Sequence, residues 1–169
     1  EERAYAMRAA ALFEAEGGYF REQSTKPLTL SYALMDSPVG VAAWIVEKFH
    51  GWSDLKDGRI ESVYSMDQML TNVMIYLVTG TFATSTWLYR GLFEDAGGAP
   101  VPEKARIEKP VGIANFPVDL IPFPPRSMVE RQMNVARWTD MGEGGHFAAL
   151  EKPEKLVADI AAFARGIGF

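Results

Sequence analysis

Two stretches in the second half of the chain decide the fold: VGIANFPVDLIPFPP (111–125) and NVARWTDMGEGGHFAALEKPE (134–154). Each begins with a short apolar run, residues 111–116 and 134–139, and each run is followed by a loop. Short apolar runs that alternate with helices are typical of parallel strands buried on both faces. The stretches therefore predict two strands of a parallel sheet, each with a loop at its carboxyl end.

The sheet that these two strands would form needs further strands. A final helix is predicted to begin at Pro153 and to bury the apolar residues Leu156, Val157, Ile160 and Phe163. Two such β-loop-α units supply too few strands for a complete sheet, and strands at the edge of a sheet seek neighbours. The sequence thus predicts an α/β fold that is incomplete on its own and needs a partner to supply the rest of the sheet.

The first half of the chain differs, because only helices are expected in residues 1–95. Ser65 to Gln68 has the spacing of a capping box. The helix that follows it is predicted to bury Met69, Leu70, Val73, Met74 and Leu77. Residues 96–106 are rich in Gly and Pro and form the predicted linker. We therefore expect a helical part over 1–95 and an α/β part over 107–169.

Composition excludes several classes of function. The net charge is −5 and the sequence pI about 5.1, which argues against nucleic acid or an anionic membrane as a partner. The absence of cysteine excludes a disulfide framework, thiolate metal sites and a cysteine nucleophile, and it fits a cytoplasmic protein. The sequence contains no run of about 18 apolar residues, so no membrane span is predicted. The N-terminal Glu1-Glu2-Arg3 has no signal pattern and suggests the interior of a longer or trimmed chain.

The chemistry is expected at the ends of the two strands. Functional groups in such sheets gather in the loops at the carboxyl ends of strands. Asp119 follows the first strand and His146 follows the second. A carboxylate that accepts the Nδ1 proton fixes the imidazole tautomer and leaves Nε2 to take a proton from water. Taken alone, an aspartate such as Asp119 in a Pro-rich loop is as often a turn former as a functional residue, and a lone histidine is more often structural than catalytic. The hypothesis therefore depends on the pair.

Long motifs in the sequence strengthen the hypothesis that Asp119 and His146 form a catalytic pair. GGHFAALEKPEKLVADIAAF (144–163) resembles the histidine loop and final helix of the microsomal-type and juvenile-hormone-type epoxide hydrolases and their bacterial relatives. GYFREQSTKPLTLSYALMDSPVGVAAWIVEKFHGWSD (18–54) resembles their most recognisable stretch, and TNVMIYLVTGT (71–81) and STWLYR (85–90) continue the match. The resemblance implies the C-terminal part of an α/β-hydrolase fold, made of a helical cap and the last β-α units of the sheet.

The resemblance also assigns roles to four residues. His146 matches the catalytic histidine, and Asp119 matches the acid that orients it, where many microsomal-type relatives have glutamate. Tyr19 and Tyr89 match two cap tyrosines that hydrogen-bond the epoxide oxygen. Two phenolic donors would stabilise the negative charge that develops on this oxygen as the ring opens. Without the motif, each tyrosine would be read as ordinary half-buried packing.

One essential group is missing from the sequence. The implied mechanism needs an aspartate nucleophile on a Gly-x-Asp-x-Gly turn, and neither that motif nor Gly-x-Ser-x-Gly occurs in the 169 residues. The nucleophile precedes the acid and the histidine in this fold, so we expect it before Glu1, in an N-terminal half that would also be the chain's main partner. His50-Gly51-Trp52 imitates an oxyanion motif of the family, but it follows the expected nucleophile and is interpreted as coincidence.

Three hypotheses follow. The first is an epoxide hydrolase that acts on a small apolar epoxide without a metal or other cofactor, with this chain inactive alone. The second is another α/β-hydrolase, such as a haloalkane dehalogenase, which would not use the paired tyrosines. The third is a non-catalytic fragment or interaction module that binds a partner through the uncovered sheet edge. The sequence is also compatible with a homo-oligomer.

Overall fold

The structure is a computed structural model that describes residues 1–95 and 106–169. The described residues form two compact units: residues 1–13, 52–55 and 106–169 make the first, and residues 14–51 and 56–95 make the second. The predicted linker 96–106 lies, apart from Arg106, outside the described residues. The division at residues 95 and 107 therefore stays a prediction.

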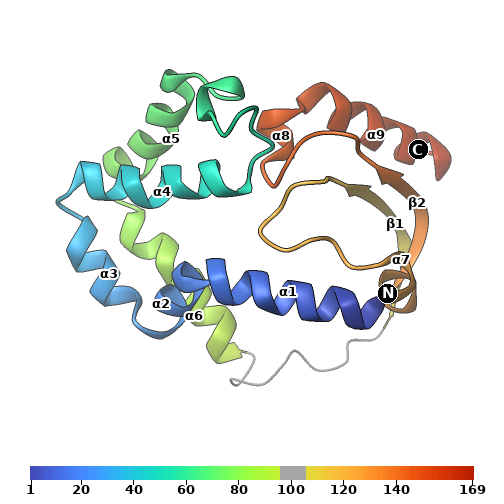
Figure 1. Ribbon diagram of the computed structural model, residues 1–169, viewed down its shortest axis with the longest axis horizontal. Helices are drawn as coiled ribbons and strands as arrows, with labels where there is room; N and C mark the ends of the chain where they lie inside the picture. The colour runs from blue at the N-terminus through green and yellow to red at the C-terminus, as the bar shows by residue number, and fades with distance from the viewer. Residues whose placement is uncertain (96–105) are drawn as a thin grey trace. The chain divides into compact units, whose positions relative to one another are not determined.

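The first unit is built on two parallel strands, β1 (Ile107–Asn115) and β2 (Met133–Asp140), which lie side by side in Figure 1. Their pairing runs to the last residue of each strand, where Asn115 faces Asp140. The predicted strands are thus present, although β1 begins four residues before the expected Val111. The short helix α7 (Arg126–Gln132) returns the chain from the end of β1 to the start of β2.

Helix α9 (Pro153–Gly166) packs on this pair of strands, and α8 (Ala148–Glu151) precedes it. The helix comes close to Gly112 of β1, where an added Cβ would lie 2.9 Å from the Phe163 ring. Asp159 of α9 is also buried, at 8 % exposed. Its Oδ1 accepts hydrogen bonds from Arg137 Nε at 2.8 Å and from Thr139 Oγ1 at 2.7 Å, both on β2. These bonds join the helix to the strand.

Two apolar residues on α9 are not buried as predicted. Val157 is 63 % exposed and Ile160 is 55 % exposed. The buried position between them is taken by Asp159, so the inward stripe runs through Leu156, Asp159 and Phe163 at helical spacing. The prediction was wrong because it ranked residues by hydrophobicity, whereas an aspartate paired with an arginine holds this position.

The second unit is helical. It contains α2 (Gly18–Thr25), α3 (Pro27–Leu34), most of α4 (Pro38–Trp52), the 3-10 turn η1 (Ile60–Ser62), α5 (Met66–Thr79) and α6 (Phe82–Asp95). Helix α1 (Glu2–Glu16) begins in the first unit. The core of the second unit comprises Leu30, Val41, Val73 and Phe82. None of the helices in the described part of the chain has the length and apolar character needed to cross a bilayer.

Helix α5 begins with the predicted capping box. Ser65 Oγ accepts the backbone N–H of Gln68, and the Gln68 side chain accepts the backbone N–H of Ser65. Met69 and Val73 are buried as predicted, but Leu70 and Met74 are 50 % and 48 % exposed. The buried stripe runs from Met69 and Val73 to Tyr76 and Leu77, which pack against the core. The predicted burial of Leu70 and Met74 is wrong, because these two residues lie on the neighbouring row of the helix surface.

Candidate active site

The structure brings His146 and Asp119 together in the first unit. Because β1 and β2 are parallel neighbours, the loops that follow them leave the same edge of the sheet. Asp119 lies in the loop after β1 and His146 in the loop after β2, 27 residues apart in sequence. The imidazole Nδ1 lies 2.8 Å from Asp119 Oδ1. The two side chains are 42 % and 40 % exposed, so solvent reaches the pair.

Asp119 is held in place by its own loop. Its Oδ1 accepts the backbone N–H of Leu120 at 2.7 Å, in addition to the bond with the imidazole. The backbone N–H of Val118 approaches the carbonyl oxygen of Gly144 at 3.4 Å and links the aspartate loop to the histidine loop. Two donors therefore converge on one carboxylate oxygen, which fixes the orientation of the carboxylate toward the histidine.

His146 is held by residues from a distant part of the chain. Its backbone N–H donates to the carbonyl oxygen of Trp52 at 2.9 Å. The Trp52 ring lies 5.1 Å from the imidazole and the Phe147 ring 5.0 Å from it, both in edge-to-face arrangements. Gly144 has a φ of +106°, which favours glycine. Gly145 has no room for a side chain, because a Cβ there would lie 2.6 Å from the Trp52 carbonyl oxygen.

The electrostatics suit a base. A carboxylate accepts hydrogen bonds only, so the bond to Asp119 places the imidazole proton on Nδ1 and leaves Nε2 as the acceptor. The hydrogen bond that His146 donates to Asp119 raises the pKa of His146 above its ordinary value. Burial opposes this shift, while the charges of Asp119 and Glu151 add to it. The arrangement can take a proton from water once the imidazole is neutral.

The two tyrosines lie together in the second unit. Tyr19 on α2 and Tyr89 on α6 have ring centroids 5.8 Å apart in an edge-to-face arrangement, and both are partly buried. The Lys48 Nζ lies 5.1 Å from the Tyr19 ring centroid. The Phe20 ring lies 5.6 Å from the Tyr89 ring. The structure thus pairs the two phenols with each other, and their role toward a substrate stays a prediction.

Of residues 50–52, which were singled out in the sequence, Trp52 contacts the imidazole of His146, whereas His50 belongs to the second unit. His50 is exposed in the second unit, and its Nε2 lies 3.0 Å from the carbonyl oxygen of Gly58. Within residues 1–95 and 106–169, no three side chains of His, Asp or Glu gather in a way that could hold a metal ion. The nucleophile that the mechanism needs has no candidate motif in the sequence.

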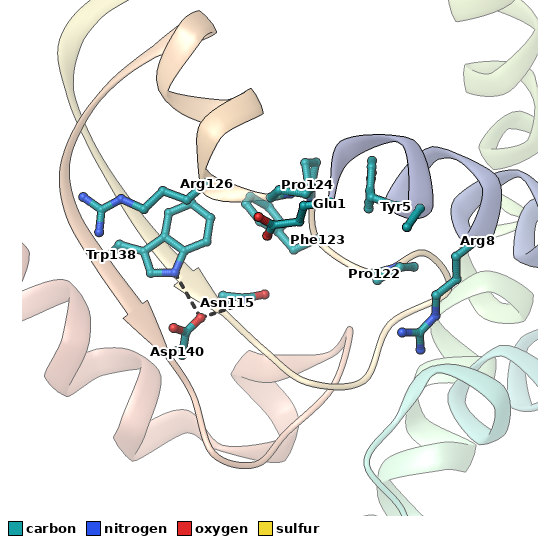
Figure 2. A pocket seen from close by; sticks show the side chains of 12 residues that line it. Glu1, Tyr5, Arg8, Asn115, Pro122, Phe123, Pro124, Arg126, Trp138 and Asp140 are labelled. Atoms are coloured by element: carbon teal, nitrogen blue, oxygen red, sulfur yellow. Dashed lines mark hydrogen bonds between the residues drawn. The ribbon is translucent and has the colours of Figure 1, made fainter.

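A pocket of about 570 Å³ opens at the ends of the two strands (Figure 2). Trp138 and Asp140 of β2 and Asn115 of β1 line it, together with Phe123 and the first turns of α1. Asp140 Oδ1 accepts hydrogen bonds from Asn115 Nδ2 at 2.8 Å and Trp138 Nε1 at 3.0 Å, and these bonds lower the pKa of Asp140. His146 and Asp119 are not among the lining residues, so the pocket is separate from the pair.

Known proteins similar to this chain are epoxide hydrolases. A putative epoxide hydrolase of Stigmatella aurantiaca is 43 % identical over 156 residues, which are 92 % of this chain and 34 % of that protein. Epoxide hydrolase 1 of Sus scrofa is 40 % identical over 153 residues, 88 % of this chain and 34 % of that protein. No protein-family model matches the chain. The chain spans about a third of the length of the curated relatives it matches.

A solved structure gives the same result for the fold. An enantioselective mutant of the Aspergillus niger epoxide hydrolase matches with a TM-score of 0.77 and 33 % identity, over 97 % of this chain and 40 % of that one. The chain is therefore similar, over nearly its whole length, to the C-terminal part of epoxide hydrolases of the α/β-hydrolase fold. This confirms the resemblance and the fold class that the sequence predicted.

Proposed function

We propose that this chain is the C-terminal part of an epoxide hydrolase, an enzyme that adds water to an epoxide to give a vicinal diol. The observation that carries the proposal is the 2.8 Å bond between His146 and Asp119 at the ends of adjacent parallel strands. The similarity to epoxide hydrolases supports the reaction class. The aspartate nucleophile would come from a segment that precedes Glu1.

The first proposed step opens the ring. The nucleophilic aspartate attacks an epoxide carbon, an ester bond forms and the ring C–O bond breaks. The released oxygen takes a proton from a tyrosine hydroxyl, for which Tyr19 and Tyr89 are the candidates. Donors aimed at this oxygen lower the barrier because they bind it more strongly once it is charged. The edge-to-face pairing of the two rings supports a joint role.

The second proposed step releases the diol. His146 Nε2 takes a proton from a water molecule, whose oxygen attacks the carbonyl carbon of the ester. The acyl C–O bond breaks, and the leaving alkoxide of the diol takes the proton from the imidazolium. The regenerated aspartic acid loses its proton, which restores the tyrosine hydroxyl. Asp119 holds the imidazole in the required tautomer and stabilises its charged form.

The substitution His146→Gln in the full-length protein tests this proposal. We expect the variant to form the ester and hydrolyse it slowly, so that mass spectrometry finds the protein heavier by one substrate molecule. The control is His50→Gln, which changes the only other histidine of the sequence and should leave diol formation unchanged. The proposal is refuted if His146→Gln forms diol at the unsubstituted rate, or if the full-length protein shows no turnover of any epoxide.

Two further parts of the proposal concern the chain itself. Residues 1–169 alone should form no diol, because the sequence contains no nucleophile motif. Diol formation by the isolated chain at an enzyme-like rate would contradict the mechanism. We also propose a small apolar epoxide as the substrate and a cytoplasmic location, which the absence of cysteine supports.

A further inference from the structure

Two carboxylates outside the histidine–aspartate pair meet around the histidine loop. They are Asp54, which follows α4, and Glu151, the last residue of α8. Glu151 Oε2 accepts the backbone N–H of Asp54 at 2.9 Å, and Glu151 Oε1 accepts the backbone N–H of Phe147 at 3.0 Å. Asp54 Oδ2 accepts the backbone N–H of Gly144 at 2.8 Å. All these residues belong to the first unit.

These bonds surround His146. The backbone N–H groups of residues 144, 146 and 147 are each held by an acceptor, from Asp54, Trp52 and Glu151 respectively. Hydrogen bonds that a carboxylate accepts are among the stronger ones in proteins. Trp52 and Glu151 also fit tightly against the loop, because a Cβ at Gly145 would lie 2.6 Å from the Trp52 carbonyl oxygen and 2.9 Å from Glu151 Oε1.

We propose that Asp54 and Glu151 form a carboxylate clamp that positions His146 against Asp119 for the water-activating step. This inference rests on the proposed function, and it makes both residues positioning residues that touch no reacting atom. The clamp acts on the backbone on both sides of His146, so it sets where the imidazole lies. A shift of about 1 Å in a reacting group can cost about 100-fold in rate.

An ordinary structural role is the alternative to this inference. Glu151 lies four residues after Phe147 and could simply brace its own turn. Against this reading, its second oxygen holds Asp54, which is 97 residues away in sequence, and the Asp54 carboxylate returns to Gly144. A glutamine at 151 would present only one acceptor oxygen and would have to lose one of the two bonds. A structural brace would lose stability, whereas the clamp would lose one step of the reaction.

The test compares Glu151→Gln, Asp54→Asn and the control Glu154→Gln in the full-length protein. Glu154 is an exposed carboxylate in the first turn of α9, so the control makes the same chemical change three residues away. Single-turnover experiments with an epoxide measure ester formation and ester hydrolysis separately. We expect ester hydrolysis to fall by about 10-fold or more in Glu151→Gln, which must lose one of its two bonds. The loss in Asp54→Asn should be smaller, because the amide oxygen can keep the bond to Gly144. Ester formation should change by less than about twofold, because His146 does not act in that step.

The outcomes separate this inference from the proposed function. An unsubstituted protein that opens no epoxide overturns the proposed function and this inference with it. An active unsubstituted protein in which Glu151→Gln behaves like the control overturns the inference alone. So does a parallel loss of both steps with a lowered melting temperature, which indicates a structural brace. If neither Glu151→Gln nor Asp54→Asn folds, the two carboxylates are structural supports and the inference is wrong.

Discussion

The bond between Asp119 and His146 allows a graded prediction, because two donors converge on one oxygen of Asp119. Oδ1 accepts both the Leu120 N–H and the Nδ1 proton of His146. In Asp119→Asn, the amide oxygen can keep this position, so the bond is retained but its acceptor is neutral. In Asp119→Ala, the bond is lost. We therefore expect the asparagine variant to hydrolyse the ester faster than the alanine variant.

The magnitudes follow from the bond and its exposure. A hydrogen bond to a charged group contributes about 1.5–3 kcal/mol, and a neutral one about 0.5–1.5 kcal/mol. Both side chains are about 40 % exposed, so solvent screening favours the lower ends of these ranges. Asp119→Asn should then lose about 1 kcal/mol and about 5-fold in the rate of ester hydrolysis. Asp119→Ala should lose about 1.5 kcal/mol and about 13-fold.

The pH dependence of ester hydrolysis gives a second measure. Asp119 raises the pKa of His146, and only the neutral imidazole can accept a proton from water. Hydrolysis should therefore slow as the pH falls through this raised pKa. Both substitutions remove the negative charge, so the fall should move to lower pH. Stopped-flow measurements of hydrolysis over pH 5–9 (roughly the range in which histidine titrates) check both points. Equal losses in the two variants, or an unmoved pH profile, would refute this reasoning.

Two further predictions concern the tyrosines and the helix of the first unit. Tyr19→Phe and Tyr89→Phe should each slow ester formation from an epoxide by about 100-fold, as for loss of one oxyanion donor, and should leave ester hydrolysis unchanged. A haloalkane substrate serves as the comparison, and ester formation from it should not respond to the same substitutions. If ester formation from the epoxide is equally insensitive, the two tyrosines have no role in the mechanism. Asp159→Ala should lower the free energy of unfolding by about 2 kcal/mol and the melting temperature by about 4–8 °C, since it leaves Arg137 without its carboxylate partner. Thermal unfolding measures this, with Glu154→Ala as the exposed control on the same helix, and an Asp159→Ala protein as stable as the control would contradict it.

Several features of this protein were set by local sequence. Ser65 and Gln68 cap α5 as predicted, because a capping box needs only residues three positions apart. The two strands were visible as short apolar runs that end in loops. The meeting of Asp119 with His146 could be inferred because parallel neighbours end at the same edge of the sheet. The long motifs of the histidine loop and the helical part carried the resemblance to epoxide hydrolases, which the comparisons confirm.

Other features were decided only by the tertiary structure. Asp54 shows no local signal in the sequence, because its bonds to Gly144 and Glu151 cross 90 and 97 residues. Asp159 has a hydrophilic side chain, and only the presence of Arg137 and Thr139 on the adjacent strand makes its burial favourable. Periodicity in a sequence reports which residues share a face of a helix. It does not report which partner that face meets, and the energy of a buried carboxylate depends on that partner.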